Sequence, residues 1–566
     1  MFGMKIRELS RREFLAVSGM TGAGLVVAGC GGGETIGGEE EGGGDGQPQE
    51  GGTFTFGRGS DSVTLDPIHA TDGESLIVCR QIFDGLLDFE PETTDLVPAL
   101  AVEVPEPEED GLVYTFPLRE GVTFHDGTPF NAEAVVFNFE RWMNSGNEYH
   151  AGGGPQASDF SYYSGMFGGF DEESIIESVE AVDEYTVRFR LREPQGPFLR
   201  NIAMSPFGIA SPAAIQEDVE EFWRNPVGTG PFRFVEWNQG STVRLEKNEE
   251  WWGTDVPVEE GGGGPFVDEV VFQSIDDNTS RVAALAGGQL SGADGLTPDD
   301  VPTIEQDPNL KVIFRPPLNV GYLAMHTQKE PFNDVNVRRA INHAIDMEAI
   351  VQAFFGETGE VATNPMPPTV PFFNEGVERY PYDPDRAREL LAEAGYEDGF
   401  DTELWFMPIP RPYMPDGRGI AQAIASDLQE VGINCELVTF EWGTYIERTG
   451  RGEHPMALLG WTGDNGDPDN FLNIHFNSAN ATEENALNIA YYENDEVDEL
   501  LNRGASTIDE GEREEAYMRV QEIIMEDAPW VTIAYTRPPL GFQNRVQGYL
   551  PSPTGGESFN SVYLSG

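Results

Sequence analysis

Positive charge is scarce in this 566-residue sequence, which has 34 lysines and arginines against 98 aspartates and glutamates. The formal net charge is -64 at neutral pH. Lysine occurs only at Lys5, Lys247, Lys311 and Lys329. A chain of this kind cannot neutralise a phosphate backbone, so nucleic acid is excluded as a partner.

The acidic residues are spread along the whole chain and do not form one block. A single cluster would indicate a site for cationic partners, whereas an even distribution indicates a property of the entire surface. Concentrated salt screens the repulsion between like charges, and a strongly charged surface keeps a protein soluble. We therefore predict a halophilic protein, adapted to high salt.

Cysteine is also rare, with Cys30, Cys79 and Cys435 as the only examples. This number excludes a small disulfide-stabilised scaffold, which needs several pairs in a short chain. Spacing alone leaves open whether Cys79 and Cys435 form a bridge.

Familiar catalytic motifs are missing too, since the sequence has no HExxH, GxxxxGKS/T, GxSxG or CxxC pattern. Their absence removes the enzyme classes that such motifs identify. No enzymatic activity, cofactor or metal is expected, although a secreted peptide hydrolase remains the alternative from a different functional class. A hydrolase would need a nucleophile and base, or a metal-bound water, in one cleft.

Residues 1–30 carry export signals. The segment Ser10-Arg11-Arg12-Glu13-Phe14-Leu15 resembles a twin-arginine signal, and an apolar run follows to Gly29. A membrane-spanning helix needs about 20 apolar residues, and this run is shorter. It ends in Leu25-Val26-Val27-Ala28-Gly29-Cys30, which resembles a lipobox with Cys30 as the lipidated residue. A retained transmembrane anchor with an incidental cysteine is the alternative.

Residues 31–50 consist mostly of glycine, glutamate, aspartate and glutamine. Such a composition cannot bury enough apolar surface to fold, so a flexible acidic linker is expected. A lipid anchor, a linker and a folded body together predict a protein held on the extracellular face of the cell membrane.

The remainder of the chain has the length of several domains and the composition of a soluble globular protein. Short alternating strands, such as Thr53–Phe56 and Thr186–Leu191, are interleaved with amphipathic helices that start at Asn131, Asp334 and Asp383. This order predicts an α/β fold. The clearest unit is a βαβ motif with strands at 402–407 and 434–440 around a helix at 419–431.

Two loops follow strand ends in this region, at 408–417 and 461–470. Ligands of open α/β sheets bind beyond the carboxyl ends of strands, so both loops are candidates for a site. The second loop is rich in aspartate. However, calcium binding of the EF-hand type needs a glutamate at the twelfth position, where His475 or Ser478 stands. Asx turns would explain most of the loop without a function.

Several motifs in this sequence resemble the extracellular dipeptide- and oligopeptide-binding proteins of ABC importers, from about residue 52 to the C-terminus. They are Gly228-Thr229-Gly230-Pro231-Phe232, Leu318-Asn319-Val320-Gly321-Tyr322-Leu323, Pro331-Phe332-Asn333-Asp334-Val335, Val337-Arg338-Arg339-Ala340 and Tyr382-Asp383-Pro384. The most specific are Arg411-Pro412-Tyr413 and the loop Gly460–Asn470, which resemble the dipeptide-binding branch.

The resemblance implies that Arg411 holds the carboxylate of a bound peptide and that Asp464 holds its α-ammonium group. The chemistry agrees, because a guanidinium pairs with a carboxylate through two hydrogen bonds and an aspartate accepts from an ammonium group. Trp461 and Tyr413 are expected to form walls of the ligand site, and Trp442 is a weaker candidate.

The resemblance also implies a periplasmic-binding-protein architecture with two hinged lobes and an extra domain. The expected domains are lobe I at 51–83, 228–314 and 534–566, the extra domain at 84–227, and lobe II at 315–533. The expected partners are dipeptides or short peptides and the permease subunits of an ABC transporter, and the protein is expected to be a monomer. Alternative ligands are haem, an oligosaccharide or a metal chelate.

Overall fold

The computed structural model describes residues 48–155, 158–482 and 485–566. The predicted signal segment, Cys30 and the linker as far as residue 47 lie outside the described residues. None of the helices within the described ranges has the length and apolar character needed to cross a bilayer.

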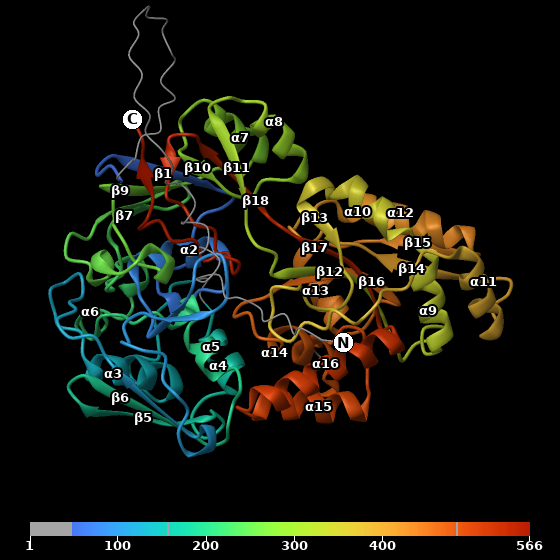
Figure 1. Cartoon of the computed structure of the whole chain (residues 1–566), viewed down its shortest axis with the longest axis horizontal. Coiled ribbons are helices and arrows are strands. Elements are labelled where there is room, and N and C mark those ends of the chain that lie inside the picture. The colour runs from blue at the N-terminus through green and yellow to red at the C-terminus, as the bar shows by residue number, and fades with distance from the viewer. Residues whose placement is uncertain (1–47, 156–157, 483–484) are drawn as a thin grey trace, which may run out of the picture. The chain divides into compact units, whose positions relative to one another are not determined.

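Sheet A has seven strands and contains the first strand of the described chain (Figure 1). Its β1 is parallel to β9 and β10, and the other pairs are antiparallel. In spatial order the strands are β11 (Leu310–Phe314), β18 (Pro539–Gln543), β10 (Gly292–Ala293), β1 (Thr53–Arg58), β9 (Glu269–Ser274), β8 (Thr242–Lys247) and β7 (Phe232–Asn238). Strands of this sheet are contacted by the helices α2 (Gly73–Ile82), α7 (Asn278–Ala286) and α8 (Val301–Glu305).

Sheet B has six strands and contains the predicted βαβ unit. In spatial order they are β13 (Gly359–Val361), β17 (Trp530–Thr536), β12 (Asn319–Met325), β16 (Met456–Thr462), β14 (Phe400–Trp405) and β15 (Ile433–Val438). β14 is parallel to both β15 and β16, and α12 (Gly417–Glu430) connects β14 to β15, as the periodicity predicts.

Helices cover sheet B, and their starts agree with the capping residues in the sequence. The Asp334 and Asp383 carboxylates accept hydrogen bonds from the first turns of α9 and α11. The helices of this part are α9 (Val335–Ala344), α10 (Met347–Phe354), α11 (Pro384–Glu393), α13 (Trp442–Gly450), α14 (Asp469–Phe476), α15 (Asp495–Ser506) and α16 (Glu510–Asp527).

Sheet C is a three-stranded antiparallel sheet of β4 (Val113–Pro117), β6 (Thr186–Leu191) and β5 (Ile176–Asp183). The helix α3 (Ala132–Met143) contacts β5 and β6, and its Asn131 cap accepts from the Ala134 N–H. The shorter helices α4 (Ser161–Phe167), α5 (Phe198–Ile202) and α6 (Pro212–Glu217) follow in the same part of the chain. Two small ribbons pair β2 (Leu87–Phe89) with β3 (Leu96–Pro98) and β19 (Val546–Gln547) with β20 (Tyr563–Leu564).

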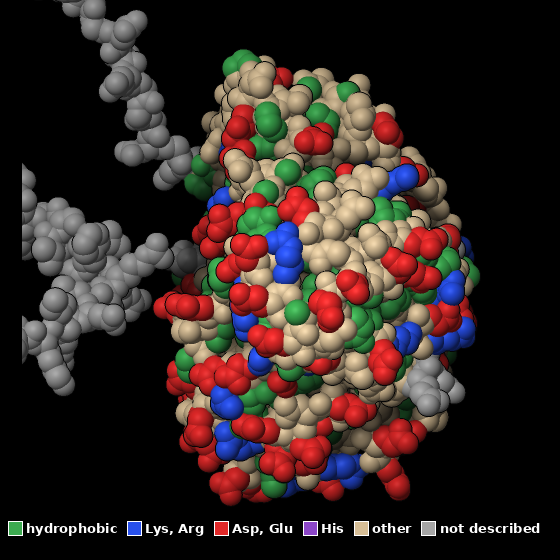
Figure 2. Space-filling model, turned by 90° about the vertical axis from the view of Figure 1, so that its right-hand side faces the viewer, with side chains coloured by type: hydrophobic (Ala, Val, Ile, Leu, Met, Phe, Trp, Pro, Cys, Tyr) green, Lys and Arg blue, Asp and Glu red, His purple; other side chains and the backbone are tan. Residues whose placement is uncertain are grey.

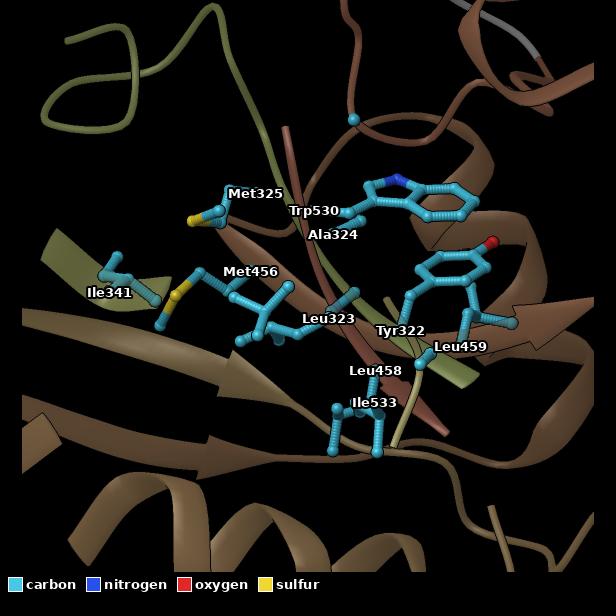
Figure 3. Close-up of a cluster of buried hydrophobic side chains, with 14 of the residues drawn as sticks. Tyr322, Leu323, Ala324, Met325, Ile341, Met456, Leu458, Leu459, Trp530 and Ile533 are labelled. Atoms are coloured by element: carbon cyan, nitrogen blue, oxygen red, sulfur yellow. The ribbon is translucent and has the colours of Figure 1, made fainter. Parts of the chain in front are cut away.

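Sheets A, B and C each pack against a buried apolar cluster. In sheet B this cluster runs from Met325 and Ile341 to Tyr322 and Trp530, whose rings stack at a centroid distance of 3.5 Å (Figure 3). Residues Ala210, Ile215 and Phe222, from the segment expected in the extra domain, pack in the cluster of sheet A.

The chain crosses between sheets A and B twice, from β11 to β12 and from β17 to β18. Both crossings have the sequence Arg-Pro-Pro-Leu, at 315–318 and 537–540. The Arg315 N–H donates to the Pro538 carbonyl at 3.0 Å and so links the two segments. Proline has a fixed φ and no N–H to donate, so β11 ends before Pro316 and β17 ends before Pro538, whereas Pro539 begins β18 opposite Phe314. β17 continues to Thr536, past the expected boundary at 534.

The two described cysteines are both free. Cys79 is buried in the cluster of sheet A, whereas Cys435 lies in β15 of sheet B. The question of a Cys79–Cys435 bridge, which the spacing leaves open, is therefore answered by the fold: Cys79 lies in α2 and packs in the cluster of sheet A, whereas Cys435 lies in a strand of sheet B.

Candidate functional site

A cavity of about 510 Å³ lies at the carboxyl-end loops of β14 and β16. All five residues named from the sequence line it, namely Arg411, Tyr413, Trp442, Trp461 and Asp464. Its size falls within the range of about 300–1,000 Å³ that is typical of small-molecule sites. The βαβ unit thus brings the two candidate loops to one cavity.

A tight turn presents Arg411 to the cavity. The Arg411 N–H donates to the Met414 carbonyl at 3.1 Å, and the Met414 N–H donates back at 2.9 Å. Met414 is fully buried in the core of sheet B and anchors this turn. The guanidinium of Arg411 is exposed and lies over the Trp442 ring, 5.3 Å from its centroid. Within the described part of the chain, this guanidinium has no ion-pair partner, so it is available to an anionic ligand.

Two glycines allow Tyr413 to pack directly on sheet B. Gly321 and Gly460 are register partners in the β12–β16 pair. A Cβ atom at Gly460 would lie 2.2 Å from the Tyr413 ring, and one at Gly321 would lie 2.4 Å from the Tyr413 carbonyl oxygen. Side chains at these positions would push the Arg411 turn away from the sheet. The glycines therefore set the position of Arg411.

Hydrogen bonds from both sides hold the Asp464 carboxylate. Asn470 donates to Oδ2 at 3.1 Å, and the Tyr162 hydroxyl donates to Oδ1 at 3.1 Å. Asn470 also accepts from the Asp464 N–H at 2.9 Å and from the Trp461 indole N–H at 3.3 Å. Asn470 therefore fixes both Asp464 and Trp461, and Tyr162 reaches the same carboxylate from α4.

The other aspartates of this loop have structural partners. Both oxygens of the buried Asp467 accept from Arg513 of α16, at 2.7 and 2.9 Å. Asp469 accepts from the Asn473 amide at 2.9 Å. The described residues contain no group of three or more histidine, cysteine, aspartate or glutamate side chains arranged to hold a metal. The oxygen-rich loop is thus occupied by internal hydrogen bonds and an ion pair.

The same loop contacts the part of the chain before residue 202. The side-chain amide of Asn465 donates to Oδ1 of Asn201 at 2.7 Å, and the Arg200 guanidinium donates to the main-chain carbonyl of Asn465 at 3.4 Å. Gly466 lies against Thr94, because a Cβ atom at Gly466 would be 2.4 Å from the Thr94 side chain. The loop therefore joins the cavity-lining carboxylate of Asp464 to contacts between the loop after β16 and the segment 94–201.

Comparison with known proteins identifies the family. The family model for bacterial extracellular solute-binding proteins, family 5, matches residues 95–483. The chain belongs to this family.

Relatives match over nearly the full length of this family 5 solute-binding protein. The dipeptide-binding protein of Escherichia coli is 36% identical over 494 residues, covering 85% of this chain and 89% of the relative. Heme-binding protein A of Haemophilus influenzae is 34% identical over 526 residues, covering 91% and 92%.

A solved structure has the same fold. The ABC transporter-associated periplasmic binding protein DppA from Helicobacter pylori, in complex with peptide STSA, aligns with a TM-score of 0.75 at 36% identity, covering 92% of this chain and 99% of that one. These comparisons confirm the expected family and the periplasmic-binding-protein type of fold.

In this solute-binding protein, burial shifts the pKa values of residues that line the cavity. The pKa of Asp464 is raised because burial disfavours the carboxylate, while the hydrogen bonds from Asn470 and Tyr162 partly offset this. Burial also lowers the pKa of His475, another lining residue, to about 4. At neutral pH the imidazole is therefore uncharged.

The sequence did not reveal several residues that complete the site. Tyr162 comes from the segment predicted as the extra domain, and no local pattern identifies it. Asn470 lies in the predicted loop, but its role depends on hydrogen bonds to side chains. Trp461 belongs to the end of β16, so the loop begins at Gly463 and not at Trp461.

Proposed function

We propose that this solute-binding protein captures dipeptides, or short peptides, by their charged ends. The observation that supports the proposal is the charge of the cavity wall. Among the described residues that line it, Arg411 and Asp464 are the only acidic or basic side chains apart from His475, whose imidazole is uncharged at neutral pH. A zwitterionic peptide offers a carboxylate to the first and an ammonium group to the second.

The test is calorimetry in molar salt on the wild type and on the variants Arg411→Ala and Asp464→Ala. Free dipeptides should bind the wild type more tightly than N-acetylated or C-amidated ones. Arg411→Ala should lose the discrimination between free and amidated peptides, and Asp464→Ala that between free and acetylated ones. Equal binding of blocked and free peptides by the wild type would show that the proposed site is wrong.

Peptide length is part of the same proposal. Each added residue separates the peptide's ends by roughly 3.5 Å, so a longer peptide moves one terminus away from its partner. An unpaired charge in a closed cleft costs about 3–5 kcal/mol. Dipeptides should therefore bind best in a series of increasing length, measured in the same calorimeter.

The proposed role is delivery to the permease subunits of an ABC transporter, without chemical change to the peptide. Incubation with dipeptides should release no free amino acids. The cavity-lining aromatics could also accommodate a flat ligand such as haem, and a relative carries the name heme-binding protein A. Mass spectrometry of material that co-purifies with the native protein would separate the two ligands.

We also propose a membrane anchor at Cys30 and the three-domain division with lobe I at 51–83, 228–314 and 534–566. The lipobox-like segment before Cys30 and the acidic linker after it support the anchor. Cys30→Ser should abolish lipid labelling and release the protein from the membrane fraction. Unchanged labelling and fractionation would contradict this assignment.

The acidic surface supports adaptation to high salt. Acidic side chains are scattered over the face drawn in Figure 2, with fewer basic ones among them. The screening length is about 30 Å at 0.01 M salt and about 3 Å at 1 M, so repulsion grows as salt is removed. The melting temperature should fall steeply from molar to millimolar salt, and a flat profile would contradict the proposal.

A further inference from the structure

Among the described residues, the wall of the 510 Å³ cavity is uncharged except at Arg411 and Asp464. Apart from Arg411 and Asp464, the described residues that line it are Thr71, Tyr322, Pro412, Tyr413, Trp442, Ile446, Thr449, Gly450, Leu459, Gly460, Trp461, Thr462, His475, Asn485, Ala486, Leu487 and Ile489. This is unusual in a chain with 98 acidic residues. Among these described residues, a charged ligand side chain would find no opposite charge.

Two large apolar side chains are exposed at this wall. Ile446 of α13 is 38% exposed and Leu487 is 46% exposed. The other large hydrophobic residues with comparable exposure in the described chain are Val102, Val182, Val235 and Tyr382, and none of them lines this cavity. An apolar group on a bound ligand would remove Ile446 and Leu487 from water, which is favourable.

The exposure of Leu487 is fixed by its backbone. Its N–H donates to the Asn480 carbonyl at 3.1 Å, and its own carbonyl accepts from His475 Nδ1 at 3.2 Å. The neighbouring Ala486 N–H donates to the Gly450 carbonyl at the end of α13, at 2.8 Å. Hydrogen bonds of its own backbone and of its neighbour's therefore hold Leu487, and Ile446 is part of the helix α13.

His475 adds an aromatic surface without adding charge. A carbonyl can only accept, so the contact with Leu487 places the imidazole proton on Nδ1. The ring lies edge-on to Trp461, with centroids 4.9 Å apart, and 5.8 Å from Tyr322. Tyr322 stacks on Trp530 at the same end of the core cluster (Figure 3). The floor of the cavity is thus aromatic.

We propose that the site selects peptides with a bulky uncharged side chain, aliphatic or aromatic, and that Ile446 and Leu487 determine this specificity. The inference rests on the proposed capture of peptides by their ends. It runs against the expectation from the net charge of -64, which by itself favours lysine- and arginine-containing ligands. Inside the cavity the residues of the wall determine the side-chain preference, because the free energy of burying a ligand side chain depends on the groups that it touches.

The test compares Phe-Leu, Ala-Ala, Ala-Lys and Ala-Glu by calorimetry in molar KCl, where the long-range field is screened. Burial of a large apolar side chain should make Phe-Leu bind about 10- to 100-fold more tightly than Ala-Ala. Ala-Lys and Ala-Glu should bind no more tightly than Ala-Ala. If Ala-Ala or Ala-Lys equals Phe-Leu, the specificity is wrong while peptide capture stands. If none of the four binds, peptide capture itself is wrong.

Substitutions then test which residues determine the side-chain specificity. Leu487→Glu and Ile446→Glu should each reduce the ratio of Phe-Leu to Ala-Lys affinity by at least about tenfold. The matched controls are Val182→Glu and Val235→Glu, since Val182 is 45% and Val235 is 39% exposed, away from this cavity. The control variants should keep the wild-type ratio. Unchanged ratios in the two cavity variants would overturn the assignment of Ile446 and Leu487, and melting curves would show that each variant is folded.

Discussion

At one end of the cavity the Asp464 carboxylate accepts hydrogen bonds from Tyr162 and Asn470, whereas at the other end the Arg411 guanidinium lies exposed over Trp442. The acidic end depends on residues from distant parts of the chain and on a buried ion pair in its loop. The basic end depends on a short local turn and on Gly321 and Gly460, which leave room for Tyr413 on sheet B. We therefore expect the acidic end to be fixed before a ligand arrives, and the Arg411 guanidinium to be ordered by the carboxylate of the proposed peptide ligand.

The acidic and basic ends of the cavity also differ in how their charges are solvated. Burial weakens the ionised form of Asp464, so its loop needs internal donors to keep the charge. An exposed guanidinium needs no such support because water solvates it. Substitutions should accordingly affect folding at the acidic end and binding alone at the basic end.

The largest effect is expected from the ion pair beneath the acidic end. Asp467→Asn would leave the Arg513 guanidinium without its carboxylate in a buried position. Breaking one partner of a buried pair costs about 3–5 kcal/mol, so thermal unfolding in molar salt should start at a clearly lower temperature. Arg411→Gln is the matched change at the basic end and should alter stability by no more than about 0.5 kcal/mol.

A double variant sharpens this prediction. Asp467→Leu combined with Arg513→Met replaces the pair by apolar groups and should cost less than either single substitution, since no buried charge is left alone. Should Asp467→Asn melt like Arg411→Gln, the acidic end would not depend on the pair.

An intermediate effect is expected from pH. In the proposed site Asp464 pairs with an ammonium group only when ionised, so affinity should be full above its pKa in the folded protein and should be lost as the pH falls through that value. Because burial raises this pKa above the ordinary value of about 3.9, the loss should begin at a higher pH than for an exposed aspartate. Below the pKa, affinity should fall about tenfold per pH unit.

C-amidated peptides isolate the acidic end, because they carry no carboxylate of their own to titrate. Tyr162→Phe removes a donor that lowers the pKa of Asp464, so the decline should move to higher pH in that variant. Asp464→Asn should remove the pH dependence. A decline at the same pH in wild type, Tyr162→Phe and Asp464→Asn would contradict the assignment.

The smallest effect is expected at the basic end. Trp442→Leu removes the ring beneath Arg411, and an exposed cation–π contact contributes about 0.5–1 kcal/mol. Affinity for free dipeptides should fall about two- to fivefold, with no change in the melting temperature. C-amidated peptides serve as the control, and their affinity should fall less in this variant. An equal loss for both would mean that Trp442 acts on the ligand and not through Arg411.

Much of the fold follows from local patterns in the sequence. Aspartate followed by proline starts α11 at Pro384, and apolar spacing defines α12 between two parallel strands. The loops that hold Arg411 and Asp464 follow from the same pattern, because they come directly after strands. Local geometry governs these features, so neighbouring residues are enough to predict them.

Other features depend on partners far along the chain. Spacing could not decide whether Cys79 and Cys435 pair, and the fold places Cys79 in the helix α2 beside sheet A and Cys435 in a strand of sheet B. The repeated Arg-Pro-Pro-Leu is visible in the sequence, yet its meaning at the two crossings appears only when β11 and β17 are seen to end there. Spacing could not distinguish the roles of the three loop aspartates, since Asp464 and Asp467 meet partners distant in the chain while Asp469 accepts from the nearby Asn473.

The sequence by itself determined the α/β elements, the family and the two charged residues of the cavity, because periodicity, capping and motif are local properties. Only the tertiary structure decided that Tyr162 donates to Asp464 across 302 positions and that Arg513 neutralises Asp467. It alone also decided that Gly321 and Gly460 make room for Tyr413. Such contacts form when segments distant in the chain are packed together, and no short stretch of sequence carries the information on which partner each side chain will meet.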